Sequence, residues 1–171
     1  MNIDLHDNVC KEELFKQLFD EHSPDLYKFL YYKYGSENNP NDLVQEAFLK
    51  LWDNCKKVKP AKARSFLFTV ANNLMLNELS KKKTRINYSK EDHKTHSEES
   101  PEYVYRENEY MEQLQKALEE LTEEQRVTFL MNRVEGKKHQ EIADMLGISR
   151  KAVEKRIYTA LRILREKVEG L

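Results

Sequence analysis

The chain is poor in the residues that make turns and covalent cross-links, with only 4 glycines, 4 prolines and 2 cysteines among 171 residues. So few glycines and prolines disfavour a sheet-rich fold with many tight turns. Hydrophobic residues make up 39% and charged residues 35%, a mixture that suits amphipathic helices. We therefore expect an all-α fold, in one domain or two small ones, because a single core is typical of about 100 to 150 residues.

Cys10 and Cys55 lie far apart in the sequence, and neither belongs to a CxxC pair. A disulfide framework is therefore not expected, which favours a reducing compartment. No apolar run approaches the roughly 20 residues that cross a bilayer, and no basic segment leads into an apolar one at the N-terminus. The sequence thus predicts a cytoplasmic protein that is neither exported nor inserted into a membrane.

The motifs of common enzyme classes are also missing. The sequence contains no Gly-rich nucleotide-binding loop, no HExxH and no GxSxG. His93 and His96 have an HxxH spacing, but no cysteine or further histidine accompanies them as a metal ligand. We expect no catalytic activity, no metal, no cofactor and no small-molecule substrate.

The formal net charge of -1 hides a segregation of charge along the chain. Residues 1–55 and 89–120 each carry -6, whereas residues 56–85 carry +8 and residues 137–171 carry +4. Clustered Lys and Arg side chains bind nucleic acid by releasing its condensed counterions. A solvated helix face could explain one basic cluster, but two separate clusters favour a protein that binds a polyanion.

Apolar periodicity predicts two helices before the first glycine. The first covers about residues 11–19. The second begins at Pro24, with His22 and Ser23 before it as a cap, and ends at Gly35.

Two further helices follow. The first is capped by Asn41 or Asp42, and the second covers about residues 63–81. The earlier of the two is predicted to bury Leu43, Val44, Ala47, Phe48, Leu51 and Trp52. The later one is predicted to bury Phe66, Leu67, Val70, Ala71, Leu74 and Leu79. It also carries three asparagines, which could read base edges or could be surface residues without a role: Asn72, Asn73 and Asn77.

Residues 84–101 mix Ser, Thr, His and charged residues with few large apolar side chains, which predicts a flexible linker. We place an N-terminal domain at residues 1–83, a linker at 84–108 and a C-terminal domain at 109–171. In the last of these, Thr122 and Gln125 match a capping box at the start of a helix that ends at Gly136. Its predicted inward residues are Val127, Phe129, Leu130 and Val134.

The most specific motif is a helix-turn-helix near the C-terminus. Ala143 allows close approach of two helices, Gly147 permits the sharp turn, and Val153 packs the second helix on the first. The N-terminal residues of such a second helix enter the DNA major groove. Seven of its residues are candidates for DNA contact: Arg150, Lys151, Glu154, Lys155, Arg156, Tyr158 and Arg162. The alternative is a helical hairpin that has the same pattern without binding DNA.

Three segments in this order resemble the extracytoplasmic-function (ECF) branch of the sigma-70 family of RNA polymerase sigma factors. They are DLVQEAFLKLW at residues 42–52, RSFLFTVANN at residues 64–73, and ALEELTEEQR at residues 117–126 followed by the helix-turn-helix. The resemblance covers nearly the whole chain. It implies an alternative sigma factor that directs core RNA polymerase to promoters and promotes DNA melting.

The resemblance also implies roles for particular residues. The first segment would dock on the clamp helices of the large polymerase subunit through Asp42, Gln45, Glu46 and Lys50. Minus-10 recognition and melting would use Lys56, Lys57, Lys59, Lys62, Arg64, Asn72, Asn73 and Asn77. The C-terminal domain would contact the polymerase flap region and bind the minus-35 element through the seven residues of the second helix. Family members often carry Lys in place of Glu154, so their minus-35 preference does not transfer.

The remaining implied partners are promoter DNA, of which one base of the non-template strand would be captured unpaired, and an anti-sigma factor. The acidic linker would lie in the basic channel of the polymerase.

Two other classes of protein are alternatives. Another kind of two-domain regulator would not require the segment at residues 42–52 or the second basic cluster. A protein-protein adaptor would leave both basic clusters without a purpose.

Overall fold

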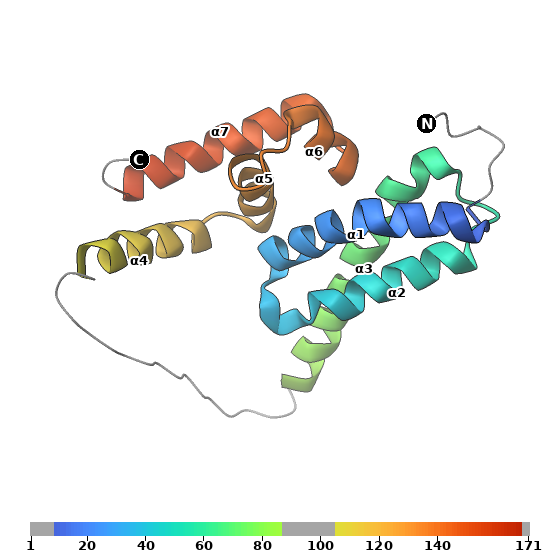
Figure 1. The fold of residues 1–171 in the computed structure, drawn as a ribbon. Coiled ribbons are helices and arrows are strands. Elements are labelled where there is room, and N and C mark those ends of the chain that lie inside the picture. Colours follow the sequence, from blue (N-terminus) through green and yellow to red (C-terminus); the bar gives the residue numbers. More distant parts are fainter. Residues whose placement is uncertain (1–8, 87–104, 169–171) are drawn as a thin grey trace.

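The computed structural model describes residues 9–86 and 105–168, and these ranges contain seven α-helices, one short 3-10 helix and no strand (Figure 1). The all-α expectation is confirmed. Residues 87–104 of the predicted linker, which include His93 and His96, lie outside the described ranges. The remaining linker residues belong to helices, 84–86 to the end of α3 and 105–108 to the start of α4. None of the described helices is long and apolar enough to span a membrane. The elements are α1 (Glu12–Tyr34), η1 (Ser36–Asn38), α2 (Pro40–Asp53), α3 (Pro60–Ile86), α4 (Tyr105–Glu119), α5 (Glu123–Arg133), α6 (His139–Leu146) and α7 (Arg150–Lys167).

Helix α1 runs without a break through Pro24, so the prediction of two helices separated at residues 22–24 is wrong. A proline inside a helix costs about 3 kcal/mol because it lacks an N–H and crowds the preceding turn. Here the buried stripe continues across it through Leu18, His22, Leu26 and Leu30, at a spacing of four residues. The free energy gained by burying this stripe outweighs the tendency of Pro24 to end the helix. Burial lowers the pKa of His22, which favours its neutral form inside the bundle.

Helices α2 and α3 both begin at a proline, at Pro40 and Pro60, and therefore earlier than predicted. Proline suits the first helical position because the N–H there has no partner within the helix. Asn39 precedes α2 in a left-handed conformation, with φ at 47°, so Asn41 and Asp42 lie inside the helix and do not cap it. The predicted end of α1 at Gly35 is confirmed.

The C-terminal helices follow the sequence-based expectation closely. The Thr122 side chain accepts a hydrogen bond from the Gln125 N–H at 3.2 Å, and the Gln125 side chain accepts one from the Thr122 N–H at 3.1 Å, which confirms the capping box. Gly147, with φ at 65°, makes the turn between α6 and α7. Two predictions are wrong: α5 ends at Arg133 and not at Gly136, and Val134, the residue after the helix, is 63% exposed.

Helices α1–α3 pack together as an N-terminal bundle, and α4–α7 form a C-terminal bundle in which α4, α5 and α6 each contact α7 (Figure 1). The two bundles also contact each other, since α5 lies against α1 and α6 against α3. One hydrophobic cluster runs through both, because Val127, Met131 and Ile142 join the buried side chains of α1–α3. A second cluster, which includes Ala117 and Leu164, joins α4 to α7.

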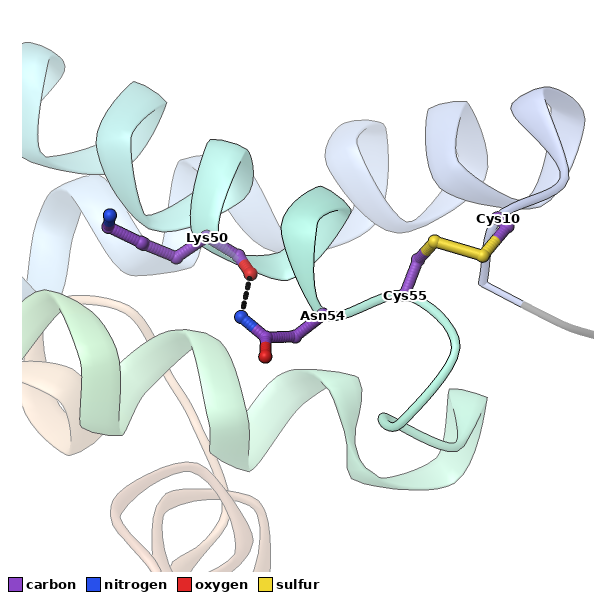
Figure 2. Close-up of a disulfide and its surroundings, with 4 residues drawn as sticks. All are labelled: Cys10, Lys50, Asn54 and Cys55. Atoms are coloured by element: carbon purple, nitrogen blue, oxygen red, sulfur yellow. Dashed lines mark hydrogen bonds between the residues drawn. A yellow bond between two sulfur atoms is a disulfide. The ribbon is translucent and has the colours of Figure 1, made fainter.

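A disulfide joins Cys10, before α1, to Cys55, after α2 (Figure 2). This corrects the expectation that the cysteines form no disulfide framework. The antiparallel packing of α1 and α2 brings the end of one helix beside the start of the other, and the two Cα atoms lie 4.9 Å apart. The two cysteines are 45 residues apart in the sequence, so the sequence alone gives no indication that they lie close together.

We predict that reducing this bond, or replacing Cys10 and Cys55 by serine, lowers the free energy of unfolding by up to about 4 kcal/mol. The reason is that the cross-link restricts the unfolded chain by closing a loop of about 45 residues. Urea titrations with and without dithiothreitol measure the effect. The double-serine variant is the control, since reductant should not change its midpoint. An oxidised wild-type midpoint equal to the reduced one would contradict the prediction.

Candidate nucleic-acid interface

The outer face of α2 is polar and carries two exposed apolar side chains. All four residues predicted to bind core polymerase are exposed there: Asp42, Gln45, Glu46 and Lys50. Beside them Leu49 is 64% exposed and Trp52 is 44% exposed. Trp52 was predicted to face inward, but it is exposed and makes an edge-to-face contact with Phe15 at 5.0 Å between ring centroids. This face therefore presents an apolar strip with charged neighbours.

A hollow of about 460 Å³ lies between the loop after α2 and the first turns of α3. Its lining combines three lysines of the predicted minus-10 set with an aromatic ring and two hydroxyl groups: Lys57, Val58, Lys59, Lys62, Ser65, Phe66 and Thr69. Such a combination can hold phosphates through the ammonium groups and stack a base on the ring. Phe66 was predicted only as a core residue, yet it is half-buried and reaches the hollow. Lys56 is exposed next to this site in the chain.

The three asparagines of α3 have different surroundings. Asn73 and Asn77 are exposed. Asn72 is half-buried, and its Oδ1 accepts hydrogen bonds from Lys33 Nζ at 2.7 Å and from the Tyr34 hydroxyl at 2.8 Å. Burial raises the pKa of Tyr34, which keeps its hydroxyl protonated and able to donate. The structure thus brings Asn72 to the end of α1 and away from the hollow.

Arg64 is also engaged within the protein. Its Nη2 lies 3.4 Å from Asp25 Oδ2 in α1, and the same carboxylate oxygen accepts a hydrogen bond from Lys137 Nζ at 2.8 Å. The Arg64 Nε is buried and has no hydrogen-bond partner in the described part of the chain. A guanidinium held at this site needs Asp25 to offset the cost of its burial.

Helix α7 presents its basic side away from the hydrophobic core. Ser149 caps the helix by accepting a hydrogen bond from the Ala152 N–H at 3.2 Å. The packing role predicted for Val153 agrees with its burial, and the inward side of the helix consists of four buried residues: Val153, Ile157, Ala160 and Leu164. Five of the seven predicted DNA-contacting residues are exposed: Arg150, Lys151, Lys155, Tyr158 and Arg162.

The other two predicted residues of α7 are half-buried. The positive charge of Arg156 acts on Lys33 of α1. Burial is the main reason that the pKa of Lys33 is lowered, and the Arg156 charge lowers it further. Glu154 accepts a hydrogen bond from Arg150 Nε at 2.8 Å and lies 3.6 Å from His139 Nδ1. The hydrogen bond from Arg150 is the main reason that the pKa of Glu154 is lowered.

Sequence reasoning missed Leu49 and the ring of Phe66 as surface features. Phe66 belongs to the apolar positions that helical periodicity assigns to a core, and only its neighbours in space show that it stays half-buried and reaches the hollow. Leu49 lies outside the predicted buried stripe of α2, so the helical spacing could have placed it on the polar face. The described residues include no group of three or more His, Cys, Asp or Glu side chains that could hold a metal ion.

Two protein-family models match the chain. Sigma-70 region 2 matches residues 18–85, which cover most of α1 and all of α2 and nearly all of α3. Sigma-70 region 4 matches residues 111–164, from α4 into α7. The hollow and the exposed face of α2 lie in the first match, and the helix-turn-helix lies in the second.

Curated relatives include the ECF RNA polymerase sigma factor SigL of Mycobacterium tuberculosis, which is 29% identical over 168 residues, covering 95% of this chain and 93% of that protein. The ECF RNA polymerase sigma factor SigX of Bacillus subtilis is 24% identical over 168 residues, covering 94% of this chain and 86% of that protein. SigE of Mycolicibacterium smegmatis is 26% identical over 153 residues, 88% of this chain, but the match spans only 60% of that protein.

A solved structure with a similar fold is that of the sigma factor RpoE in complex with the anti-sigma factor NepR from Bartonella quintana. Its TM-score is 0.57 at 21% identity, with 89% of this chain and 94% of that chain covered. The likeness extends over both bundles and supports the fold.

We predict that Arg150→Gln raises the pKa of Glu154 toward the ordinary glutamate value, because it removes the donor that stabilises the carboxylate. Carboxylate chemical shifts followed by NMR across a pH titration measure this change. Arg162→Gln is the matched control, since Arg162 pairs with Glu166 at 3.3 Å and should leave Glu154 unaffected. An unchanged Glu154 titration in the Arg150 variant would refute the assignment.

Proposed function

The chain belongs to the ECF group of the sigma-70 family, and from this membership we propose that it is an alternative sigma factor that binds core RNA polymerase, recognises minus-10 and minus-35 elements and promotes DNA melting. The observation that carries the proposal is the presence of regions 2 and 4 on one chain in the family's order, at residues 18–85 and 111–164. Sigma factors regulate transcription initiation, and we propose that this chain supplies recognition while the polymerase supplies the chemistry.

Core polymerase would bind the outer face of α2. The proposed contacts are Asp42, Gln45, Glu46 and Lys50, together with the apolar strip of Leu49 and Trp52. The exposure of these six side chains supports the proposal, since protein interfaces commonly place large apolar or aromatic anchors inside a polar rim. The clamp helices of the large subunit are the proposed partner for this face.

Promoter melting would use the hollow at the start of α3. An unpaired base could stack on Phe66 while Lys57, Lys59 and Lys62 contact the strand's phosphates. Unstacking a base costs a few kcal/mol, and these contacts would offset that cost. Lys56, Asn73 and Asn77 are proposed to extend this surface. Arg64 and Asn72 are proposed DNA contacts as well, although their side chains are engaged within the protein in this structure.

The minus-35 element would be bound by α7. Arg150 and Lys151 at its first turn are placed to read bases in the major groove, while Lys155, Tyr158 and Arg162 would reach bases or phosphates further along. Glu154 is proposed to accept from cytosine and Arg156 to contact the backbone. For Glu154, base reading would compete with its hydrogen bond from Arg150.

The proposed domain organisation is an N-terminal domain at residues 1–83, a linker at 84–108 that lies in the polymerase channel, and a C-terminal domain at 109–171 that also contacts the flap region. Such a factor would act in the cytoplasm, where it would meet polymerase, and an anti-sigma factor would hold it inactive. The solved neighbour from Bartonella quintana is bound to an anti-sigma factor, which motivates this last proposal.

We predict that core polymerase binds this protein and then initiates specific transcripts from a promoter library of the source genome. Combined Gln45→Ala and Glu46→Ala should weaken core binding about tenfold, which corresponds to a loss of about 1.4 kcal/mol shared between two contacts inside the proposed interface. Fluorescence anisotropy of the labelled protein gives the dissociation constant.

Glu112→Ala with Gln113→Ala is the matched control, because this pair has the same composition and is exposed on α4. It should leave core binding unchanged. Equal affinities of the two double variants would remove the α2 assignment. Failure of core polymerase to bind the wild-type protein would overturn the proposed function as a whole.

We also predict that Phe66→Ala slows promoter opening by the holoenzyme and weakens binding of the unpaired minus-10 strand by roughly 5- to 150-fold, the worth of one base stacked on an aromatic ring. Permanganate footprinting measures opening. Phe66→Trp keeps an aromatic ring at the same site and should retain most of the activity. Comparable losses in both variants would indicate that Phe66 acts through packing alone.

A further inference from the structure

Helix α7 carries one acidic residue within its basic, DNA-facing stretch. Among residues 150–165, six are Lys or Arg, and Glu154 is the one acidic residue. This stretch includes the surface that the proposed function assigns to the minus-35 element. A free carboxylate on such a surface would repel the phosphates of DNA. The presence of Glu154 therefore calls for a role that offsets this repulsion.

The Glu154 carboxylate is held by side chains from both helices of the helix-turn-helix. Its Oε1 accepts a hydrogen bond from Arg150 Nε, one turn earlier in α7, at 2.8 Å. His139 Nδ1, at the first position of α6, lies 3.6 Å from the same oxygen. The hydrogen bond from Arg150, and secondarily the interaction with His139, lower the pKa of Glu154, so its carboxylate is ionised near neutral pH. The three side chains thus form one unit that joins α6 to α7.

The backbone on both sides of this unit has a fixed position. The Ser149 side chain caps α7 immediately before Arg150. The Lys138 N–H donates to Glu141 Oε2 at 2.7 Å, which closes the start of α6 immediately before His139. Helices α6 and α7 also pack directly against each other. The two side chains that contact Glu154 therefore start from a well-defined backbone.

Helix stability does not explain the pair of Arg150 and Glu154. At a spacing of four residues, an acidic residue that precedes a basic one stabilises a helix more than the reverse order does, and here the basic residue comes first. A cation in the first turn also opposes the positive end of the helix dipole. Arg150 thus occupies a position that disfavours it locally, but the first turn of a recognition helix is the part that enters the major groove.

The Arg150 guanidinium retains its base-reading donors in this arrangement. Within the described part of the chain only its Nε–H is engaged, and the side chain is 63% exposed. The two terminal nitrogens carry four further N–H groups, and two of these match the O6 and N7 acceptors of guanine. An arginine side chain loses rotamer entropy when it binds, and a carboxylate that already holds Nε reduces this loss.

We propose that Glu154 and His139 are positioning residues that orient Arg150 to read a guanine of the minus-35 element. The inference rests on the proposed function of α7 and gives Glu154 an indirect role there, through Arg150. His139 keeps the carboxylate beside the guanidinium, so base recognition depends on a residue of α6, outside the recognition helix. A direct contact of Glu154 with cytosine is the competing role, and a double-mutant cycle separates the two.

The test uses holoenzyme assembled from core polymerase and the full-length protein, and a promoter that it transcribes, randomised at the minus-35 element. Discrimination is the ratio of affinities for guanine and for the other bases at the position that Arg150→Ala relaxes. Arg150→Ala should reduce this ratio by roughly 5- to 150-fold, the worth of a bidentate contact with guanine. Glu154→Ala and His139→Ala should each reduce it by roughly 2- to 12-fold, the worth of ordering one long side chain.

Coupling to Arg150 is the decisive measurement. In the Arg150→Ala background, Glu154→Ala and His139→Ala should leave discrimination unchanged. Glu154→Ala alone should bind unrelated duplex more tightly, because it removes a negative charge, while it discriminates less. His139→Asn keeps an amide near the place of Nδ1 and should retain most of the wild-type ratio. Glu166→Ala is the matched control, since it removes the partner of Arg162 from a pair of the same order and spacing and should not change the ratio.

A second readout needs neither DNA nor polymerase. Nitrogen-15 relaxation of the free full-length protein gives the order parameter of the Arg150 Nε–H bond. This order parameter should fall in Glu154→Ala and in His139→Ala and should recover in His139→Asn. Circular dichroism of each variant checks that the helices remain folded.

Independent effects of Glu154→Ala and Arg150→Ala, at two different base pairs, would assign Glu154 to a base of its own and overturn the inference. Unchanged Arg150 order parameters would also overturn it, as would a wild-type holoenzyme without any preference for guanine. Core binding and transcription by the wild-type protein are measured with the same preparations. Their failure would count against the proposed function, and the order parameters would still decide whether Glu154 and His139 position Arg150.

Discussion

Helix α1 connects the two bundles, since α2 and α3 pack against it within the N-terminal bundle and α5 packs against it from the C-terminal bundle. Its buried stripe of Leu18, His22, Leu26 and Leu30 must be removed from water along the whole length of the helix, which is why the helix continues through Pro24. Because α2 and α3 are both aligned on α1, the exposed face of one and the basic hollow of the other have fixed positions within one bundle.

The segregation of charge explains how a chain of nearly zero net charge can present basic surfaces. The net charge of +8 in residues 56–85 comes mainly from basic residues around the start and the end of α3, and three of these lysines line the hollow. Acidic side chains elsewhere serve partly to hold cations in place, as Asp25 does for Arg64 and Lys137. Local fields of this kind, and not the isoelectric point, decide where a polyanion is attracted.

Local signals in the sequence predicted the C-terminal helices well, because caps and turns depend on residues that are neighbours in the chain. The Thr122 capping box and the Gly147 turn are examples. The polymerase-binding and DNA-binding roles of individual residues stay predictions. They are supported by the exposure of the predicted side chains on α2 and α7 and by the lysines that line the hollow. Periodicity failed where coverage by another element decides burial, as for Trp52 and Val134. Contacts such as Lys28 with Glu135, 107 residues apart, leave no mark on local sequence, so the packing of the two bundles could not be foreseen.

The bond between Cys10 and Cys55 has a bearing on the hollow that adjoins it. Cys55 stands two positions before Lys57, the first lining residue, so one rim of the hollow is anchored covalently to the beginning of α1. A rim that is already immobilised loses less conformational entropy when a strand settles into it, and a preformed site binds more tightly than one that must be ordered by its ligand. The oxidised and reduced forms of this protein should therefore differ in their affinity for single-stranded DNA.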